Sequence, residues 1–420
     1  MHQEVTLSNG LRVLMVPMPS LQSVSIGVFI KIGSRYERLA QSGISHFIEH
    51  MLFKGTHQLP SARLIAEAIE GIGGDSNAYT SVETTVFYAK VAASQVDFAL
   101  AYLADLLRHS LFSPADIEKE RRIIGEEISM VYDSPDEWLE VLTDQVIWPN
   151  HPLGQAITGT PESLATFTRA SLLAFFERGY HPGNAIIAVG GAFNPDQLVA
   201  QINGLWGDWE TSQAPDFMPA PQLRHQPTWQ IEDRAIEQGH LCLALPGLPR
   251  QHPDRYALSL LSTILGDGMS SRLFQVIRED KGLAYAVDSS LTFLQDTGTL
   301  TIYAGVDPDR AEEALQAILT EVERLRLDLP TDAEIERAKA YLKGRLVLGL
   351  EDSYSRAAWV AYQALFMDKI RSPEEVLAAY DLVSAADVRA VAQAILDPAF
   401  YRLAAVGPFG QGQELAELLV

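Results

Sequence analysis

The hexapeptide VFYAKV (86–91) resembles TIYAGV (301–306), which lies about 215 residues later, and an amphipathic helical pattern follows each of the two. A second pair of related segments, SPADIEKERR (113–122) and TDAEIERAKA (331–340), lies downstream of the first pair. Self-similarity over such a distance is typical of a duplicated structural unit. The sequence therefore predicts two related modules of about 200 residues each.

Each predicted module combines short strands with longer helical segments. The stretches SVSIGVFIKIG (23–33) and NAIIAVGGAF (184–193) have the composition of strands, and helical patterns of about 12 to 20 residues lie between such stretches. Hairpin-like pairs of strands occur beside separate runs of helices. We therefore expect an α+β fold with mainly antiparallel sheets, with a doubly wound parallel sheet as the alternative.

A proline-rich segment separates the two modules. Residues 204–229 contain four prolines, which disfavour regular helix and favour an extended connector. The sequence thus predicts a first module over residues 1–210, a linker over 211–228 and a second module over 229–420.

The charge of the chain limits its partners. Acidic residues outnumber basic residues by 54 to 32, which gives a formal net charge of −22. A negative field of this size repels phosphate backbones and anionic lipid surfaces. We expect no nucleic-acid partner, and we expect basic peptides to be attracted.

Cysteine usage and hydropathy indicate the compartment. Cys242 is the single cysteine, so no intrachain disulfide can form, which suits a reducing environment. Residues 1–17 alternate polar and apolar types around an Asn-Gly turn, which predicts a hairpin and not a signal peptide. No apolar stretch approaches the roughly 20 residues that cross a bilayer. We expect a cytoplasmic protein without membrane insertion.

The segment GISHFIEHMLFKGT (43–56) predicts a helix with two different faces. Apolar residues recur at helical spacing on one face, and polar residues cluster on the other. The apolar residues are Ile44, Phe47, Ile48, Met51 and Leu52, and the polar residues are His46, Glu49 and His50.

Two histidines four residues apart on a helix can bind one zinc ion. Their Cβ atoms lie about 6 Å apart, which allows both rings to reach zinc at about 2.1 Å. Glu49 lies close to the open position and can take a proton from water that the metal activates. The order HxxEH is the motif of inverted zinc peptidases. The alternative is a solvated helix face that carries two histidines by chance.

A third ligand is expected on the helix that SPADIEKERRIIGEEISMVYD (113–133) predicts. Ser113 is a suitable N-cap with Pro114 at the first helical position. Glu120 and Glu127 lie two turns apart at the edge of the apolar stripe, where a partly buried carboxylate favours a cation as its partner. A salt-bridged surface is the alternative, because three basic residues are close in sequence.

These motifs resemble the pitrilysin or insulysin family of inverted zinc peptidases, and most of all its short bacterial members, which resemble the mitochondrial processing peptidase. The resemblance extends over nearly the whole chain. It implies one Zn²⁺ per chain, with His46, His50 and Glu127 as ligands and Glu49 as the general base. It also implies that Glu120 orients a ligand histidine and tunes the charge of the site.

Two further segments resemble parts of the same family. GGDSNAYTSVETTVFYAKV (73–91) resembles the strand that pairs with substrate, where Asn77 and Ala78 would bind an extended peptide backbone. The alternative for Asn77 is turn chemistry after two glycines. RLFQVIREDKGLAYAV (272–287) resembles the segment with an Arg and Tyr pair, here Arg278 and Tyr285, which would stabilise negative charge on the scissile carbonyl. Without the resemblance, a salt-bridging arginine and a packed tyrosine are the simpler interpretation.

The second module lacks the ligand residues. Ser259, Ser262 and Thr263 lie opposite the two histidines and Glu49 in the internal alignment. Together with the zinc motif of the first module, the resemblance implies a zinc metalloendopeptidase that cleaves unfolded peptides in a closed chamber and acts as a homodimer. The alternative is a catalytically silent homologue that acts as a scaffold or peptide-binding subunit.

Overall fold

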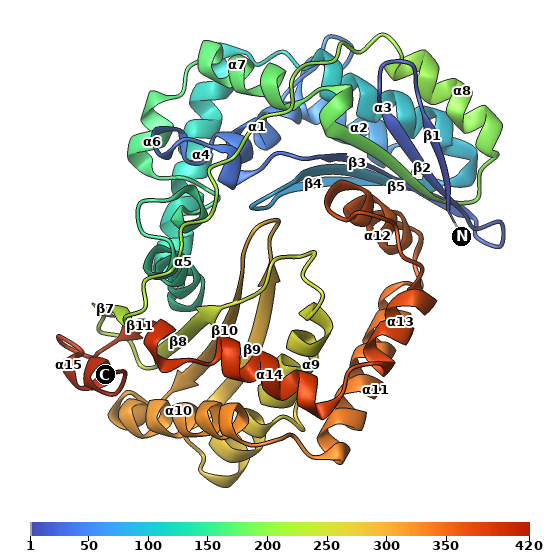
Figure 1. Ribbon diagram of the computed structural model, residues 1–420. Coiled ribbons are helices and arrows are strands. Elements are labelled where there is room, and N and C mark those ends of the chain that lie inside the picture. Colours follow the sequence, from blue (N-terminus) through green and yellow to red (C-terminus); the bar gives the residue numbers. More distant parts are fainter. Residues whose placement is uncertain (1) are drawn as a thin grey trace. The chain divides into compact units, whose positions relative to one another are not determined.

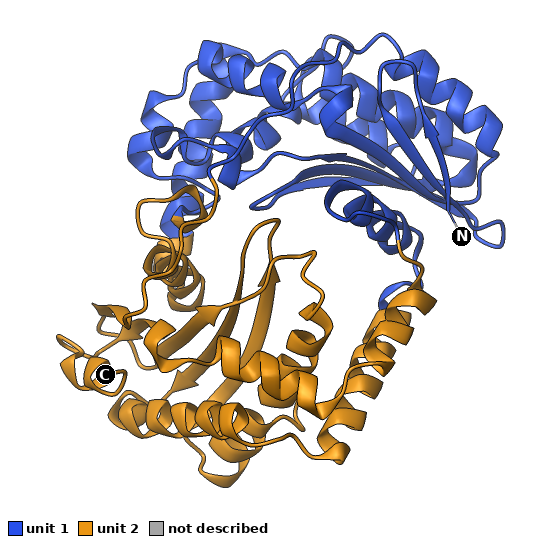
Figure 2. Cartoon of the chain, in the orientation of Figure 1, with its two compact units in different colours: residues 1–130, 155–218, 348–370 blue, residues 131–154, 219–347, 371–420 orange. Residues whose placement is uncertain are grey.

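The computed structural model describes residues 2–420 and contains two β-sheets surrounded by α-helices (Figure 1). The chain forms two compact units (Figure 2). Unit 1 comprises the residues up to 130 together with 155–218 and 348–370, and unit 2 comprises residues 131–154, 219–347 and 371–420. None of the described helices is long and apolar enough to cross a membrane.

Unit 1 is built on a six-stranded sheet, which we call sheet 1. Its strands are β1 (Gln3–Thr6), β2 (Arg12–Pro17), β3 (Ser23–Ile30), β4 (Asp75–Thr80), β5 (Thr85–Ala92) and β6 (Ala185–Gly191). Its helices are α1 (Ile44–Leu52), α2 (Ala62–Glu70), α3 (Val96–His109), most of α4 (Pro114–Asp133), α6 (Pro161–Thr166), α7 (Arg169–Gly179), α8 (Pro195–Trp206) and α12 (Ser353–Phe366).

Unit 2 is built on a five-stranded sheet, which we call sheet 2. Its strands are β7 (Thr228–Asp233), β8 (Gly239–Pro246), β9 (Ala284–Phe293), β10 (Gly298–Val306) and β11 (Arg402–Gly407). Its helices are α5 (Pro135–Ile147), α9 (Arg255–Leu265), the π-helix η6 (Phe274–Asp280), α10 (Ala311–Leu327), most of α11 (Asp332–Gly349), α13 (Pro373–Asp381), α14 (Ala385–Ile395) and α15 (Gln413–Glu417).

Apart from the additional edge strand β1 of sheet 1, the two sheets have the same topology. Sheet 1 has the order β1-β2-β6-β3-β5-β4, and sheet 2 has the order β7-β11-β8-β10-β9. In each sheet one parallel pair, β2 with β6 or β7 with β11, is followed by three antiparallel pairs. The repeated hexapeptides lie in the equivalent strands β5 and β10. The predicted α+β fold with two duplicated modules and mainly antiparallel sheets is confirmed.

Each unit contains one helix from the other half of the sequence. Helix α12 packs on β2, β3 and β6 of sheet 1, on the face opposite α1 and α3 (Figure 1). Helix α5 packs on β8 and β11 of sheet 2. Because helices cover both faces of sheet 1, all but the first residue of β3 are buried, which explains its nearly continuous apolar sequence. Residues 211–227 contain neither helix nor strand.

The start of α1 is held by a buried carboxyl group. Glu37 follows a short 3-10 helix, and its side chain accepts hydrogen bonds of 2.8 Å from the backbone amides of Gly43 and Ser45. These amides are among the groups that a helix N-terminus leaves without partners. Burial raises the pKa of Glu37 to about 8, although both amides act in the opposite direction. Gly43 has a φ of +90°, and a Cβ there would lie 2.7 Å from the Cα of Gly159.

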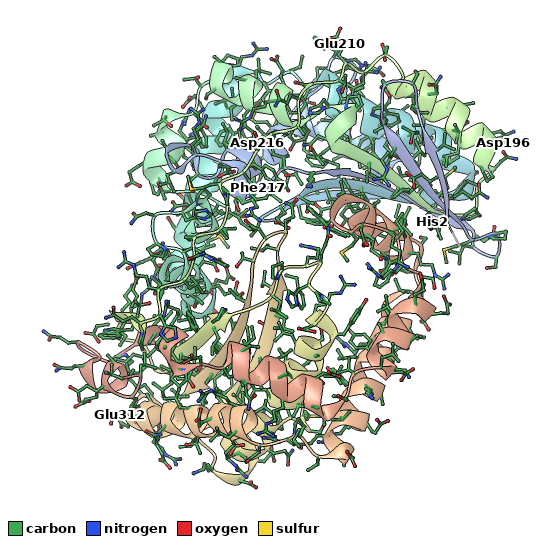
Figure 3. All side chains as sticks on the ribbon, viewed as in Figure 1. His2, Asp196, Glu210, Asp216, Phe217 and Glu312 are labelled. Atoms are coloured by element: carbon green, nitrogen blue, oxygen red, sulfur yellow. The ribbon has the colours of Figure 1, made fainter. Side chains whose placement is uncertain are left out.

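The segment before Glu37 is fixed by contacts of Arg35. Arg35 is fully buried and forms an ion pair with Glu83. Its guanidinium group lies 3.8 Å from the ring centre of Phe217, which is labelled in Figure 3. The backbone amide of Arg35 also donates to the carbonyl of Val82. The loop that leads into α1 is therefore tied to the turn between β4 and β5.

Glu37→Ala tests the contribution of this carboxyl group to stability. The substitution leaves two buried amides without an acceptor, so we expect the free energy of unfolding to fall by roughly 2 to 5 kcal/mol. Urea unfolding followed by circular dichroism measures the change. Glu67→Ala is the control, because Glu67 lies in an exposed ion pair with Arg63 whose loss costs less than about 1 kcal/mol. Equal stabilities of the two variants would contradict the assigned role.

Candidate metal centre

Helix α1 presents two histidines on one side. Its apolar residues Ile44, Phe47, Ile48, Met51 and Leu52 are all buried in the core of unit 1, as the sequence pattern predicted. This packing leaves His46 and His50 on the other side, with their ring centres 4.6 Å apart. His46 is almost fully buried, and His50 is partly exposed.

Helix α4 brings Glu127 to the two histidines. The Nε2 atom of His46 lies 3.7 Å from Oε1 of Glu127, and the Nε2 atom of His50 lies 3.8 Å from Oε2 of the same carboxylate. One ligand atom from each residue lies within 4.8 Å of the others. Atoms bound to one tetrahedral zinc at about 2.1 Å are separated by about 3.4 Å, so a small contraction would bring the three groups to zinc distance.

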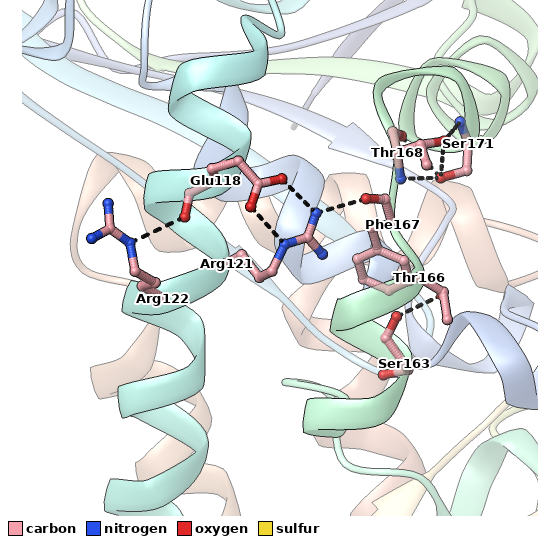
Figure 4. Close-up of polar contacts among 8 residues, drawn as sticks. All are labelled: Glu118, Arg121, Arg122, Ser163, Thr166, Phe167, Thr168 and Ser171. Atoms are coloured by element: carbon pink, nitrogen blue, oxygen red, sulfur yellow. Dashed lines mark hydrogen bonds and ion pairs between the residues drawn. The ribbon is translucent and has the colours of Figure 1, made fainter.

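Contacts outside the cluster hold α4 in place. Figure 4 shows Arg121 between the carboxylate of Glu118 on the same helix and the carbonyl oxygen of Phe167, which accepts a hydrogen bond of 2.7 Å. The nearby Ser163 donates to the carbonyl oxygen of Ser42, directly before the helix that carries the histidines. The segment 163–167 therefore contacts both α4 and the start of α1.

Glu120 lies behind His50 and not beside Glu127. It is fully buried, and its Oε2 atom lies 3.2 Å from Nδ1 of His50 and 3.0 Å from the ammonium group of Lys54. Burial alone would raise the pKa of Glu120, but the hydrogen bonds from His50 and Lys54 outweigh it and hold the pKa below its usual range. A carboxylate at Nδ1 favours the tautomer whose Nε2 atom is free to bind metal.

Burial keeps His46 neutral. Loss of hydration, and then the proximity of His50, lowers the pKa of His46 to about 4. A histidine ligand binds metal through an unprotonated ring nitrogen. At neutral pH His46 therefore needs to lose no proton to become a ligand, and the donor set of two imidazoles and a carboxylate fits a catalytic zinc site.

Glu49 has a partner that the sequence analysis missed. Its Oε2 atom accepts a hydrogen bond of 2.5 Å from the hydroxyl group of Thr80, the last residue of β4. Burial raises the pKa of Glu49, and this hydrogen bond partly opposes the effect. Alternation along β4 could have indicated the contact, because Ala78 and Thr80 point to the same face of a strand. Lys54 was also missed, although it follows His50 by four residues.

Two predicted substrate-binding residues lie on β4, which is an edge strand of sheet 1. Asn77 is exposed and pairs with Tyr88 of β5, and Ala78 is partly buried. The Asn77 side chain accepts a hydrogen bond from the amide of Ala78. One edge of β4 pairs with β5, and the opposite edge has no partner strand within residues 2–420.

Arg278 and Tyr285 belong to unit 2. Arg278 lies on the π-helix η6, where its guanidinium group is 3.8 Å from the carboxylate of Glu279 and 4.9 Å from the ring centre of Phe274. Tyr285 lies near the start of β9, an edge strand of sheet 2, and is 54% exposed. Its side chain is thus accessible, and its hydroxyl group forms a hydrogen bond with that of Tyr303, whereas the Arg278 guanidinium group has an acidic neighbour.

The comparisons with known proteins agree with this geometry. Residues 12–161 match the family described as "Insulinase (Peptidase family M16)", and residues 166–342 match "Peptidase M16 inactive domain". The chain is 37% identical over 410 residues to "Uncharacterized zinc protease YmxG" of Bacillus subtilis, covering 98% of this chain and 99% of that protein. It is 36% identical over 417 residues to "Uncharacterized zinc protease ML0855" of Mycobacterium leprae, covering 99% of this chain and 93% of that protein.

A solved structure extends the similarity to three dimensions. "The crystal structure of a protease from Helicobacter pylori" matches with a TM-score of 0.91 and 25% identity, covering 97% of this chain and 99% of that one. The two matched family regions, the curated relatives and this structure agree with the resemblance that the sequence motifs predicted. The chain therefore belongs to the insulinase family of peptidases, family M16.

Proposed function

We propose that this protein is a zinc-dependent metalloendopeptidase that hydrolyses peptide bonds of unfolded peptides. The observation that carries the proposal is the group His46, His50 and Glu127, whose ligand atoms lie within 4.8 Å of one another, with Glu49 on the same helix face as the histidines. The names of the relatives, which call them zinc proteases, support the same metal. We propose one Zn²⁺ per chain.

In this mechanism Glu49 is the general base. Bound zinc would supply the positive charge that acidifies water and polarises the scissile carbonyl group. Glu49 takes the proton of the attacking water and delivers it to the departing amine, and its raised pKa brings it closer to the operating pH. Glu120 keeps His50 oriented, because it contacts Nδ1 of the ring, whereas Glu127 lies near Nε2. Lys54 in turn holds the Glu120 carboxylate.

The free edge of β4 supports an extended peptide as the substrate. A peptide that adds to an edge strand gains main-chain hydrogen bonds without regard to its side chains. Asn77 and Ala78 lie in the middle of β4, three and two residues, respectively, before Thr80, which contacts Glu49. We propose that these two residues bind the substrate backbone.

Arg278 and Tyr285 are proposed to stabilise the reacting carbonyl group. Negative charge develops on the carbonyl oxygen during attack, and a phenol hydroxyl or a guanidinium group can stabilise it. The exposure of Tyr285 supports this role. We further propose a homodimer, in which either the same chain or its partner contributes Tyr285 to the site.

A cavity in unit 2 supports basic peptides as substrates. It has a volume of about 560 Å³ and lies between α5 and the β9–β10 hairpin. Four carboxylates and several hydroxyl groups line it, and none of the four forms an ion pair among the residues that the structure describes. The carboxylates are those of Asp136, Glu140, Asp144 and Asp288. Uncompensated carboxylates in a partly enclosed space favour a cationic occupant.

The equivalent space in unit 1 is filled. Helices α5 and α12 begin after the N-cap residues Ser134 and Asp352, so Asp136 corresponds to Tyr354 and Asp144 to Tyr362. In unit 1 the hydroxyl groups of both tyrosines contact that of Tyr79, at 3.2 and 2.8 Å. The fold thus accommodates bulky rings at these positions, and their replacement by two aspartates opens the polar cavity of unit 2.

The alternative function is a scaffold or peptide-binding subunit without catalysis. The match of residues 166–342 to a domain described as inactive favours it, because this region covers much of unit 2. Such a protein would retain the edge strand β4 but would not need the three metal-binding groups. Zinc content and peptide cleavage by the purified protein distinguish the two functions.

Glu49→Gln and Glu127→Gln test the catalytic site. We expect Glu49→Gln to retain one zinc per chain in metal analysis while peptide cleavage falls by about 10² to 10⁴-fold, because only the base is lost. Glu127→Gln should lose zinc, whereas its exposed neighbour Glu126→Gln should keep both zinc and activity. Cleavage by Glu49→Gln at the unmodified rate would refute the assignment, and an unmodified protein without zinc or cleavage would favour the scaffold.

Tyr285→Phe tests the proposed role of the phenol group. Loss of one donor to the developing oxyanion should lower kcat by about 10² to 10³-fold with little change in zinc content. Light scattering should give the mass of two 46.2 kDa chains. Mixing Tyr285→Phe with Glu49→Gln then locates the phenol: a partner-completed site recovers about a quarter of the activity, and a site within one chain recovers none. An unchanged kcat for Tyr285→Phe would exclude the role.

Asp144→Asn tests the preference for basic peptides. Burial, and then the proximity of Glu140, raises the pKa of Asp144 to about 7, so its carboxylate ionises between pH 6 and pH 8. We expect KM for a lysine- and arginine-rich peptide to fall over this range, and Asp144→Asn to raise KM at pH 8 by about tenfold. Glu210→Gln, an exposed change of equal charge, is the control. Equal effects on a neutral peptide would show that the cavity does not select charge.

A further inference from the structure

Thr80 links the substrate-facing strand to the proposed base. Its hydroxyl group donates a hydrogen bond of 2.5 Å to Oε2 of Glu49. It is also the last residue of β4, the strand whose free edge contains Asn77 and Ala78. One residue is therefore part of the peptide-binding strand and a partner of the carboxylate that handles the proton.

The surroundings of Thr80 leave it little freedom. Thr80 forms the last pair of the β4–β5 ladder with Thr85, and the amide of Ser81 donates to the carbonyl of Thr84 at 2.7 Å to close the turn. The amide of Ser34 donates to the carbonyl of Ser81. The side chain of Thr85 in turn donates to the carbonyl of Ile32. The turn is thus held by the loop that leads into α1.

The opposite face of β4 is fixed independently. Side chains alternate along a strand, so Tyr79 points away from the face that carries Thr80. The hydroxyl group of Tyr79 contacts those of Tyr354 and Tyr362 on α12. The end of β4 is therefore held by α12 on one face and by Glu49 on the other.

A carboxylate held by hydrogen bonds has a defined orientation. The backbone amide of Thr80 contributes one hydrogen bond to Glu49, and the Thr80 hydroxyl contributes the stronger one, at 2.5 Å to Oε2. Without the contact to the hydroxyl group, the Glu49 side chain would sample other rotamers. A smaller fraction of the enzyme would then have the carboxylate in the position that accepts the proton. Misplacement of a catalytic group by about 1 Å costs on the order of 10²-fold in rate.

We propose that Thr80 is a positioning residue that fixes the carboxylate of Glu49 and couples it to the strand that binds the peptide. This inference rests on the proposed function. A peptide paired with β4 would then lie on the strand that also orients the Glu49 carboxylate. The position of the scissile bond relative to the base would therefore be fixed by a single strand. A purely structural tie between β4 and α1 is the competing explanation.

The test compares Thr80→Val with Thr80→Ser. Valine keeps the shape of threonine without the hydroxyl group, whereas serine keeps the donor. We expect Thr80→Val to lower kcat by about 10 to 100-fold, with KM, zinc content and melting temperature close to those of the unmodified protein. Thr80→Ser should retain most of kcat. In the double variant Thr80→Val/Glu49→Gln, the loss should not exceed that of Glu49→Gln alone, because Thr80 acts through Glu49.

A second readout does not depend on activity. A crystal structure of zinc-loaded Thr80→Val should show the Glu49 carboxylate rotated or in more than one conformer. Thr166→Val is the control for removal of a threonine hydroxyl, since Thr166 donates only to the carbonyl of Ser163. Its kcat and the Glu49 conformer should not change.

Several results would overturn the inference. These are a kcat for Thr80→Val within twofold of the unmodified protein, a Thr80→Ser variant as slow as Thr80→Val, or loss of zinc or of stability in Thr80→Val. Failure of the proposed function is distinct from these results. It would appear as an unmodified protein that cleaves no peptide, or as a Glu49→Gln variant with full activity.

Discussion

The meeting of two imidazoles and a carboxylate between α1 and α4 is the constraint on which the rest of unit 1 depends. His46 is almost fully buried, Glu120 is fully buried, and Glu127 lies between the two rings. Removing such groups from water is costly unless they find partners of opposite charge. Lys54 compensates one carboxylate, and a divalent cation between the rings would compensate the other.

Such a site requires two helices held to within a fraction of an ångström. The nine-residue helix α1 is too short to be stable alone, so its position comes from tertiary contacts. Glu37 satisfies the amides at its start, its apolar side is buried, and Arg121 holds α4 on the connection between α6 and α7. Each of these contacts lies outside the ligand set but determines whether the ligand atoms meet.

Duplication has produced two sheets of one topology with different chemistry. In unit 1 the space between sheet 1 and α12 is filled by tyrosines, which hold β4 at a fixed position. In unit 2 the corresponding space is a cavity lined by carboxylates. The helix equivalent to α1 is α9, where Ser262 bonds to Ser289 within the core and no metal ligand remains. A buried polar site is costly, and one copy suffices to provide it.

Much of this organisation follows from the sequence. Helical periodicity alone places His46, Glu49 and His50 on one face, and the two-turn spacing aligns Glu120 with Glu127, because a helix has a fixed number of residues per turn. The internal repeat and the alternation of strands and helices predict the duplicated α+β fold. The family resemblance singled out Glu127 as the candidate third ligand among several acidic residues of the same helix, and the structure places it beside the two histidines.

Other features were decided by tertiary structure alone. Helices α5 and α12 each pack on the sheet of the other half, although nothing in their sequences specifies the sheet that they cover. The contacts of Thr80 with Glu49 and of Glu37 with the start of α1 join residues 31 and 6 positions apart through side chains. Periodicity assigns a residue to a face of its own element. Which elements face one another is decided only when their apolar surfaces pack. The sequence therefore determines which residues share the polar face of a helix, and the tertiary structure determines which other helix or strand that face contacts.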